Sequence, residues 1–534
     1  MNRRAVIGLV AVLAAGALFL TSCAPFLTAL LEGGSGARGR AVIATPDAGF
    51  TDYSAQRPKW SSCGGGARCA DVYAPLDWAD PGGERITLRL AKQPATGGDP
   101  IGTLFVNLGG PGVAGASAVR DYVDGLVGAD VRERYDVIGW DPRGTGDSSA
   151  VYCLDDAGLD EFVYGTGDPE ADGAYLEYGS DAWIEDGIAA NEEFGAACAA
   201  KTGPLLGHVD TLSTVRDLEM LRGIVGDAKL NYLGYSYGTR IGALYADTFP
   251  ERSGRLVLDG AMDPAADINE LSRQQVEGIE GALRAYVADC LTRDGCPLGA
   301  AGDKTGGAPD ERAVDRGMAR IAALLAEVER TPIRAKDGRM LYDTTLFTAL
   351  IAPLYSEWRW PELDTLITEV SAARAGVAFR LADDYNDRIG GVYETNLLEA
   401  FTAINCLDFP RPERLDFDAM RADAAETSRL APVTGKYQTF GDVTCAKWPV
   451  PAVDVIHPVR GAGADPLLIV GTTGDPATPY RWAESLAGQL ESGVLVTYVG
   501  DGHTAYGKSA CINGIVDDYL LRGDVPAADA ARCE

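Results

Sequence analysis

Residues 231–249 read NYLGYSYGTRIGALYADTF, and the motif Gly234-Tyr235-Ser236-Tyr237-Gly238 in this stretch decides the fold. The motif fits Gly-x-Ser-x-Gly, and it stands between a predicted short strand (231–234) and a predicted helix (239–249). A tight strand-to-helix turn exposes the serine side chain, and glycines on both sides remove Cβ atoms that would clash there. The helix N-terminus adds positive potential where an oxyanion would form. We therefore predict that Ser236 is a nucleophile.

A serine hydroxyl needs a base, and the chain has three histidines: His208, His457 and His503. His503 stands in Gly500-Asp501-Gly502-His503-Thr504, a loop that directly follows a predicted strand at 494–499. The other two histidines lie outside such loops, so we interpret them as structural or surface residues. His503 is therefore the predicted base.

The base needs an acid that orients it. Asp475 follows a predicted strand at 466–471, which directly precedes the histidine strand. Asp259 and Asp263, after a strand at 256–258, are the alternative acids. We prefer Asp475, because the chain order Ser236, Asp475, His503 is the order found in α/β-hydrolases.

A glycine-rich loop, Gly109-Gly110-Pro111-Gly112, follows the predicted strand 103–108. In a serine hydrolase, an N–H from this loop and the N–H of the residue after the nucleophile form the oxyanion hole. We predict that Tyr237 and either Gly109 or Gly110 donate here. The alternative is a phosphate-binding loop, but the loop lacks a following Lys-Ser/Thr and the Gly-x-Gly-x-x-Gly spacing.

Strands and helices alternate along much of the chain, which predicts an α/β fold of the α/β-hydrolase type with a mostly parallel sheet. A hairpin is expected at 70–76 and 85–91. From 263 to 443 helical patterns dominate, and we interpret this segment as a large helical cap. The predicted units are a signal peptide (1–22), a tether (23–44), the core (45–262), the cap (263–443) and the rest of the core (444–534).

The chain contains 77 acidic and 47 basic residues, a net charge of −30, which disfavours a nucleic-acid partner. Three histidines make a histidine-based metal site improbable, and we expect neither a metal nor a cofactor. Peptides are the expected partners, while the oligomeric state is left open. Hydrophobic residues make up 46% of the chain, which is enough for a large packed core.

The N-terminus predicts export. Arg3 and Arg4 precede an apolar run at 5–20, which ends in Leu20-Thr21-Ser22-Cys23. This ending resembles the lipobox of bacterial lipoproteins, in which the signal is cut before a lipidated cysteine. We expect lipid on Cys23 to anchor the protein to the outer face of the cell membrane. An uncleaved signal anchor is the alternative, and a secreted form is also consistent with the signal.

Eleven cysteines occur, so lipidation of Cys23 would leave an even number that can pair outside the cytosol. Proximity suggests the pairs Cys63–Cys69 and Cys290–Cys296. The remaining neighbours in sequence are Cys153–Cys198, Cys406–Cys445 and Cys511–Cys533, although spacing alone does not determine the connectivity.

Together, GGPG, DPRGTGDS, GYSYGT, TGDPATP and GDGHT resemble the motifs of secreted tripeptidyl aminopeptidases of actinobacteria, relatives of proline iminopeptidase, over about 69–533. The resemblance implies the triad Ser236, Asp475 and His503. One departure is that Asn107-Leu108 precedes the glycine loop, where relatives often carry His or Asn-Pro. Exopeptidases must hold a free α-amine, and a carboxylate is the expected partner. Asp408, in a stretch that resembles a family motif, is one candidate, and Glu357 and Glu394 are two more.

These observations predict an extracellular serine exopeptidase that releases short peptides, above all tripeptides, from free N-termini through an acyl-enzyme. An esterase or lipase with the same triad is the alternative. A binding lipoprotein without catalytic activity is a third hypothesis, which the filled triad positions disfavour.

Overall fold

The computed structural model describes residues 53–165, 176–299, 309–412, 414–453, 455–527 and 531–534. The predicted signal peptide, the tether and Cys23 lie outside these residues. None of the helices in the described part of the chain has the length and apolar character needed to cross a membrane.

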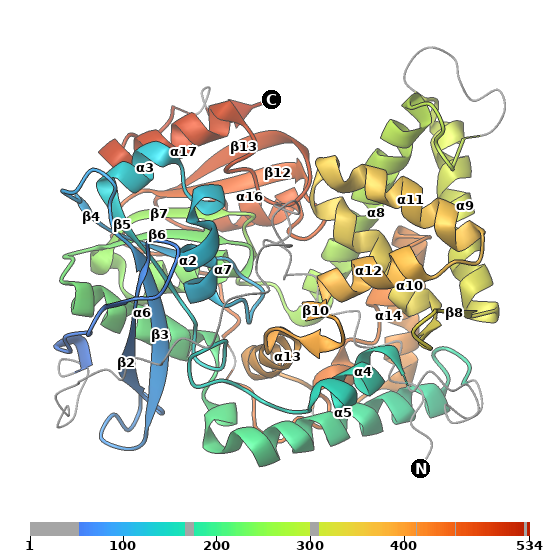
Figure 1. Cartoon of the computed structure of the whole chain (residues 1–534), viewed down its shortest axis with the longest axis horizontal. Coiled ribbons are helices and arrows are strands. Elements are labelled where there is room, and N and C mark those ends of the chain that lie inside the picture. The colour runs from blue at the N-terminus through green and yellow to red at the C-terminus, as the bar shows by residue number, and fades with distance from the viewer. Residues whose placement is uncertain (1–52, 166–175, 300–308, 413, 454, 528–530) are drawn as a thin grey trace.

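A ten-stranded sheet forms the centre of one half of the molecule, in the order β1-β2-β3-β5-β4-β6-β7-β12-β13-β14 (Figure 1). The strands β1 to β3 and the β3–β5 pair are antiparallel, and all pairs from β5 to β14 are parallel. The predicted hairpin and mostly parallel sheet are confirmed. The strands are β1 (Ser61–Ser62), β2 (Arg68–Pro75), β3 (Arg85–Gln93), β4 (Gly102–Asn107), β5 (Tyr135–Trp140), β6 (Leu230–Tyr235), β7 (Ser253–Asp259), β12 (Leu467–Gly474), β13 (Gly493–Asp501) and β14 (Arg532–Cys533).

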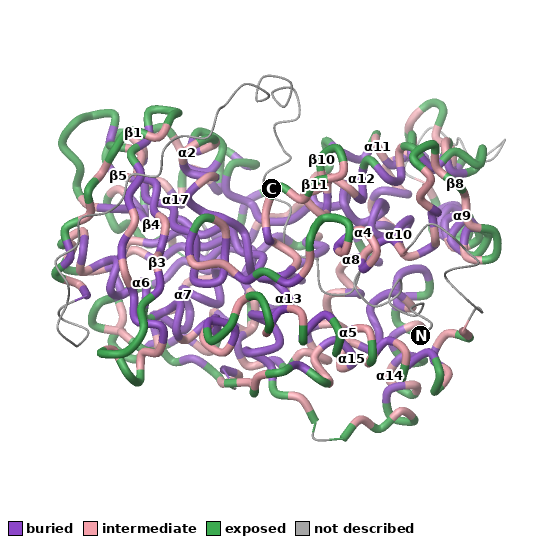
Figure 2. The backbone as a smooth tube through the Cα atoms, turned by 60° about the horizontal axis from the view of Figure 1, so that its bottom comes forward, coloured by how far each residue is buried: buried purple, intermediate pink, exposed green. Residues whose placement is uncertain are grey.

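Both faces of the parallel strands are buried, which explains their continuous apolar sequences. On β4, Phe105 packs into one hydrophobic cluster, whereas Leu104 and Val106 pack into another on the opposite face. Figure 2 shows that β3, β4 and β5 lie in a mostly buried region. The helices of this half are α2 (Gly115–Leu126), α3 (Ala129–Arg134), α6 (Thr211–Val225), α7 (Tyr237–Thr248), α16 (Tyr480–Gln489) and α17 (Ala510–Arg522).

The cap helices form a separate hydrophobic cluster beside the sheet (Figure 1). They are α8 (Ile268–Thr292), α9 (Glu311–Arg330), α10 (Asp343–Ile351), α11 (Trp360–Ser371) and α12 (Gly376–Tyr385). Helix α14 (Phe417–Leu430) packs in a smaller cluster beside them, and two small hairpins complete the cap, β8 (Ile333–Arg334) with β9 (Met340–Leu341) and β10 (Arg388–Ile389) with β11 (Val392–Tyr393).

Some helices do not follow the predicted division at 262 and 443. Helix α13 (Leu397–Asp408) falls within the predicted cap, yet it packs into the same cluster as the core helices. Helices α4 (Asp156–Tyr164) and α5 (Asp181–Thr202) fall within the predicted core, but Trp183 of α5 packs against Met420 of α14. The hydrophobic clusters therefore contain residues from both sides of the predicted core–cap boundaries.

Five disulfides join the pairs of cysteines that are neighbours in sequence: Cys63–Cys69, Cys153–Cys198, Cys290–Cys296, Cys406–Cys445 and Cys511–Cys533. Two of them tie secondary-structure elements together, α13 to α15 (Asp442–Cys445) and α17 to β14. The five suggested pairs are confirmed.

Strand register explains how the predicted site residues meet. Asn107 is paired with Gly234, Tyr235 with Asp259, and Gly474 with Asp501. The carboxyl ends of β4, β6, β7, β12 and β13 are therefore at one edge of the sheet. The loops that carry the glycine motif, Ser236, Asp475 and His503 all leave from this edge, which is where ligands bind in open α/β sheets.

Candidate active site

Ser236 occupies a strained turn between β6 and α7. Its φ of 55° and ψ of −125° lie outside the ordinary regions for a residue with a side chain, at a cost of about 1–3 kcal/mol. Two contacts hold it: its N–H donates to the Asp259 carbonyl at 2.9 Å, and the Thr239 hydroxyl donates to its carbonyl at 2.5 Å. Ser236 is 3% exposed and lines a pocket.

Close backbone packing explains the two motif glycines. A Cβ on Gly234 would lie 2.5 Å from the Gly238 carbonyl oxygen, and one on Gly238 would lie 2.7 Å from the carbonyl oxygen of Asn107. Both distances are shorter than any ordinary van der Waals contact. Glycine is therefore required for β6 to turn into α7 against the end of β4.

Asp475 and His503 form a buried pair. The His503 Nδ1 lies 2.9 Å from both carboxylate oxygens, and the two residues are 2% and 3% exposed. Four further donors reach the carboxylate: the N–H groups of Ala477, Thr478 and Thr504, and the Thr478 hydroxyl. Burial alone would raise the pKa of Asp475, but His503 and these donors lower it below its usual value. The carboxylate is thus ionised at neutral pH.

The alternative acids have other partners. Asp259 accepts hydrogen bonds from the N–H groups of Ala505 and Tyr506, and so holds the chain just after His503. Burial raises the pKa of Asp259 to about 6. Asp263 accepts from the Ala265 N–H and the Gln489 amide. The geometry favours Asp475 as the acid that orients His503.

One turn brings the serine and the histidine together. The Ser236 N–H is bonded to Asp259, and a Cβ on the next residue, Gly260, would lie 3.2 Å from Cε1 of the His503 ring. Gly260 has a φ of +70°, which favours glycine. Its missing side chain leaves the space in which the imidazole ring approaches the serine turn.

Tyr355 is a site residue that the sequence did not indicate. It ends η7 (Ala352–Tyr355) in the cap, and its ring meets the His503 ring edge-on, at 5.3 Å and 88°. Its carbonyl accepts the His503 N–H at 2.9 Å. The Lys508 ammonium donates to the His503 carbonyl at 2.5 Å. The cap therefore helps to position the histidine, and no sequence motif marks this contact.

The glycine loop offers one suitable donor rather than two. The Gly109 N–H already donates to the Asn107 side-chain oxygen at 2.9 Å, which favours Gly110 as the donor from this loop. Gly109 acts as a spacer instead, because a Cβ there would lie 2.9 Å from Cβ of Ser236. Among the described residues, no acceptor binds the Gly110 N–H. Tyr237 begins α7, where its N–H has no helical acceptor.

A pocket of about 70 Å³ adjoins Ser236 and Gly110. Its walls are mainly apolar, and no charged side chain belongs to them. The polar side chains are Ser236, Ser272, Gln275, Asn405 and Thr478, and the apolar ones are Pro111, Met262, Ile268, Leu271, Phe401, Phe409, Ala477 and Trp482. Core and cap segments both contribute to it.

The three candidate amine partners lie in different places. Asp408 is 1% exposed and accepts from both the N–H and the hydroxyl of Thr211, so these contacts disfavour it as the partner of a substrate amine. Its pKa rises to about 6 because it is buried. Glu394 lines a separate cavity with Asp141 and Glu399. Exposed Glu357 accepts the N–H of Asp501 at 3.2 Å, two residues before His503.

The two other histidines are distant from this chemistry. The backbone carbonyl of His208 accepts from Arg143, which forms a fully buried ion pair with Asp217 at 2.7 Å. His457 lies near the surface, 3.5 Å from Asp247. Arg143 thus braces the loop after β5. Across the described residues, no group of three or more His, Cys, Asp or Glu side chains is placed to hold a metal ion.

Comparison with known proteins adds independent findings. Residues 431–533 match a family model described as TAP-like protein, and residues 103–306 match one described as alpha/beta hydrolase fold. The chain is 36% identical to serine protease Hip1 of Mycobacterium tuberculosis, over 92% of this chain and 93% of that protein. It is 34% identical to carboxylesterase B of the same species, over 95% and 98%. With the tripeptidyl aminopeptidase of Streptomyces lividans it shares 30% identity, over 86% and 83%.

Proposed function

The chain belongs to the α/β-hydrolase family of serine hydrolases that contains these relatives, and from this premise we propose an extracellular exopeptidase that releases short peptides, above all tripeptides, from free N-termini. Ser236 is the proposed nucleophile, His503 the base and Asp475 its orienting acid. The observation that carries the proposal is the buried Asp475–His503 pair beside the strained Ser236 turn. The export signal at the N-terminus supports the extracellular location, with lipid on Cys23 as the anchor.

In the proposed reaction, the Ser236 Oγ attacks the peptide carbonyl while the His503 Nε2 takes its proton. Asp475 stays ionised and stabilises the imidazolium that forms. The imidazolium then donates its proton to the leaving amine, and an acyl-enzyme is left on Ser236. A water molecule, deprotonated by His503, hydrolyses the ester and restores the serine.

The negative oxygen that develops during attack is bound by the N–H groups of Tyr237 and Gly110. Both are available, since one begins a helix and the other has no acceptor among the described residues. Each such donor stabilises the transition state by about 3–4 kcal/mol. The positive end of α7 adds to this stabilisation.

The apolar pocket defines the first substrate preference. Because it adjoins both Ser236 and Gly110, it faces the side chain of the residue whose carbonyl is attacked. Its volume of about 70 Å³ suits a small apolar side chain, and its walls offer no countercharge for Asp or Lys. We expect tripeptide p-nitroanilides ending in Ala or Val to have kcat/KM values at least about tenfold above those ending in Asp or Lys. Similar values across this series would contradict the assignment.

Dependence on the free amine is the second expected property. Acetylation of a tripeptide p-nitroanilide removes the charge that a carboxylate recognises, and we expect kcat/KM to fall at least about 100-fold. The measurement is steady-state hydrolysis of the paired substrates. Equal turnover of both substrates would reject the exopeptidase in favour of an esterase-like hydrolase. This is the second candidate function, and the similarity to carboxylesterase B supports it.

Glu357 is the proposed partner of the substrate amine, because it is exposed and bonded to the backbone two residues before His503. We expect Glu357→Gln to raise KM about tenfold for free tripeptide substrates and to leave acetylated substrates unaffected. Glu394→Gln is the matched control, since Glu394 lines a different cavity. A larger effect of the control than of Glu357→Gln would contradict this role.

A further inference from the structure

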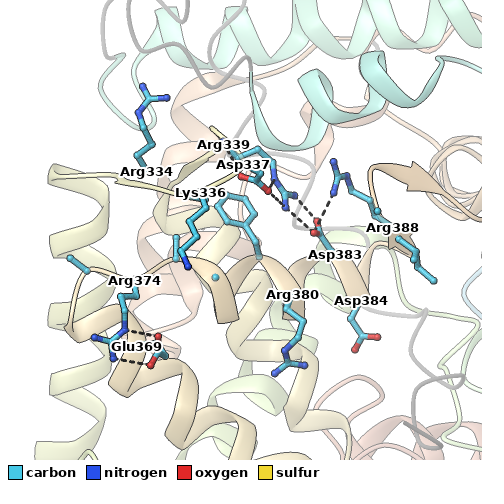
Figure 3. Close-up of a pocket in the computed structure, with 17 residues that line it drawn as sticks. Arg334, Lys336, Asp337, Arg339, Glu369, Arg374, Arg380, Asp383, Asp384 and Arg388 are labelled. Atoms are coloured by element: carbon cyan, nitrogen blue, oxygen red, sulfur yellow. Dashed lines mark hydrogen bonds and ion pairs between the residues drawn. The ribbon is translucent and has the colours of Figure 1, made fainter. Parts of the chain in front are cut away.

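A large cavity in the cap is separate from the proposed catalytic pocket. Its volume is about 780 Å³, against about 70 Å³ for the pocket at Ser236, and the two share no wall residue. The β8–β9 hairpin, the turn after α11, helix α12 and strand β10 form its walls (Figure 3). A cavity of this size falls within the usual range for ligand sites, about 300–1,000 Å³.

The charge of the cavity is the reverse of the charge of the chain. The whole sequence has 77 acidic and 47 basic residues. Ten charged residues line the cavity, and basic ones outnumber acidic ones: Arg334, Lys336, Arg339, Arg374, Arg380 and Arg388 against Asp337, Glu369, Asp383 and Asp384. A concentration of positive charge on so acidic a protein attracts anionic ligands.

Every carboxylate of the cavity already has a guanidinium partner. The ion pairs are Asp337–Arg339 at 2.8 Å, Glu369–Arg374 at 2.6 Å, Asp383–Arg339 at 2.6 Å and Asp384–Arg359 at 2.8 Å. In contrast, Arg334 and Lys336 form no ion pair with any described residue, and the Arg334 guanidinium reaches only the Gly338 carbonyl, at 3.1 Å. These two cations are therefore available to a ligand.

The framework around these cations is firmly held. The Arg339 guanidinium lies 4.0 Å from the centre of the Phe379 ring and 4.9 Å from that of Tyr164. Two hydrogen bonds, at 2.6 and 2.8 Å, join it to Asp383. Arg388 binds the same carboxylate at 3.3 Å. A ligand would thus meet walls that need little reorganisation, which favours binding.

The arrangement fits an extended ligand better than a single small anion. Figure 3 shows Arg334 and Lys336 extending from the hairpin in different directions, so they do not converge on one point. Ile389, another wall residue, is 52% exposed and offers an apolar contact. We propose that this cavity binds an acidic peptide segment, with carboxylates on Arg334 and Lys336 and an apolar side chain on Ile389.

The experiment measures peptide binding rather than hydrolysis, so its result is independent of the proposed function. A fluorescein-labelled, N-acetylated peptide Glu-Glu-Leu-Glu-Glu is titrated with the full chain carrying Ser236→Ala, and anisotropy gives Kd. The same titration uses Gln-Gln-Leu-Gln-Gln. We expect the glutamine peptide to bind at least about tenfold more weakly, and the affinity of the glutamate peptide to fall at high salt.

The variant Arg334→Gln/Lys336→Gln, made in the same background, should raise Kd for the glutamate peptide about tenfold. Lys59→Gln is the matched control, because Lys59 is an exposed lysine outside the cavity. A thermal unfolding midpoint equal to that of the Ser236→Ala parent would show that the fold of the double variant is preserved.

Three results would overturn the proposal. The first is equal affinity for the two peptides, and the second is equal affinity of the double variant and the Lys59→Gln control. The third is a preference for another anion: inorganic pyrophosphate that displaces the glutamate peptide at the same concentration, or phosphatidylglycerol vesicles that bind the protein through Arg334 and Lys336 while the peptide does not.

Discussion

Replacing Ser236 by Ala should lower kcat on a chromogenic tripeptide amide by about 10⁶-fold, as observed when a triad nucleophile is removed. The reason is that the acyl-enzyme can no longer form, and the oxyanion donors alone leave a small residual rate. The Ser236 backbone has a φ of 55° in a strained turn. Alanine, like serine, has a Cβ, so the substitution does not change the steric strain of this turn. Steady-state kinetics with highly purified protein measures the loss, and a fluorophosphonate probe should label the parent but not the variant.

Ser272→Ala is the matched control for this substitution, because Ser272 lines the same pocket and its hydroxyl binds the Ile268 carbonyl within α8. We expect it to change kcat less than about threefold, because its hydroxyl is already bonded within α8 and takes no part in the proposed proton transfer. If Ser236→Ala lost less than about tenfold, or if the two variants lost equal activity, the nucleophile would have to be sought elsewhere.

The second large effect is expected for Asp475→Asn, which should lower kcat about 10⁴-fold. The carboxylate accepts from the His503 Nδ1, so it selects the tautomer whose Nε2 can take the serine proton. An amide in its place can donate to Nδ1 and stabilise the opposite tautomer. It also removes the negative charge that stabilises the imidazolium during attack. Steady-state kcat on the same tripeptide amide is the readout.

Two comparisons separate this role from a general loss of stability. Asp475 also receives hydrogen bonds from Ala477, Thr478 and Thr504, so thermal unfolding of the variant must be measured alongside its kinetics. Asp263→Asn, at one of the alternative acids, should leave kcat within about threefold of the parent. A loss of activity explained entirely by unfolded Asp475→Asn protein, or a comparable loss in folded Asp263→Asn protein, would contradict the assignment.

The sequence predicts local elements of this protein more accurately than the way in which distant segments pack. The strand at 231–234 and the helix at 239–249 were expected within a few residues of β6 and α7, because hydrophobic pattern and glycine position act locally. The cap boundaries were harder to place. Helix α13 joins the core, and α5 contacts both halves, because Phe194 packs in the core cluster while Trp183 packs with Met420 of α14. These contacts join segments that are far apart in the chain.

The predicted amine partner Asp408 shows the same contrast between what a local sequence pattern indicates and what long-range packing decides. Asp408 looked suitable in sequence because a carboxylate stood within a stretch resembling a family motif. In the structure Thr211, on a different helix, takes both of its oxygens. A residue type and its sequence neighbours do not reveal which distant donor will bind a buried carboxylate. The hydrogen-bond partner of Asp408 could therefore be identified only from the tertiary structure.

The sequence by itself determined the local turn at Ser236, the chain order of Ser236, Asp475 and His503, and a mostly parallel sheet whose strand ends bring these three residues to one edge. These follow from backbone preferences and burial patterns within short stretches of chain. Only the tertiary structure decided that the Gly109 N–H is bonded while no described residue accepts from the Gly110 N–H, and that Tyr355 of the cap supports His503. It also decided that Arg334 and Lys336 of the cap cavity form no ion pair with a described residue. The physical reason is that hydrogen bonds and ion pairs between distant segments depend on how those segments pack.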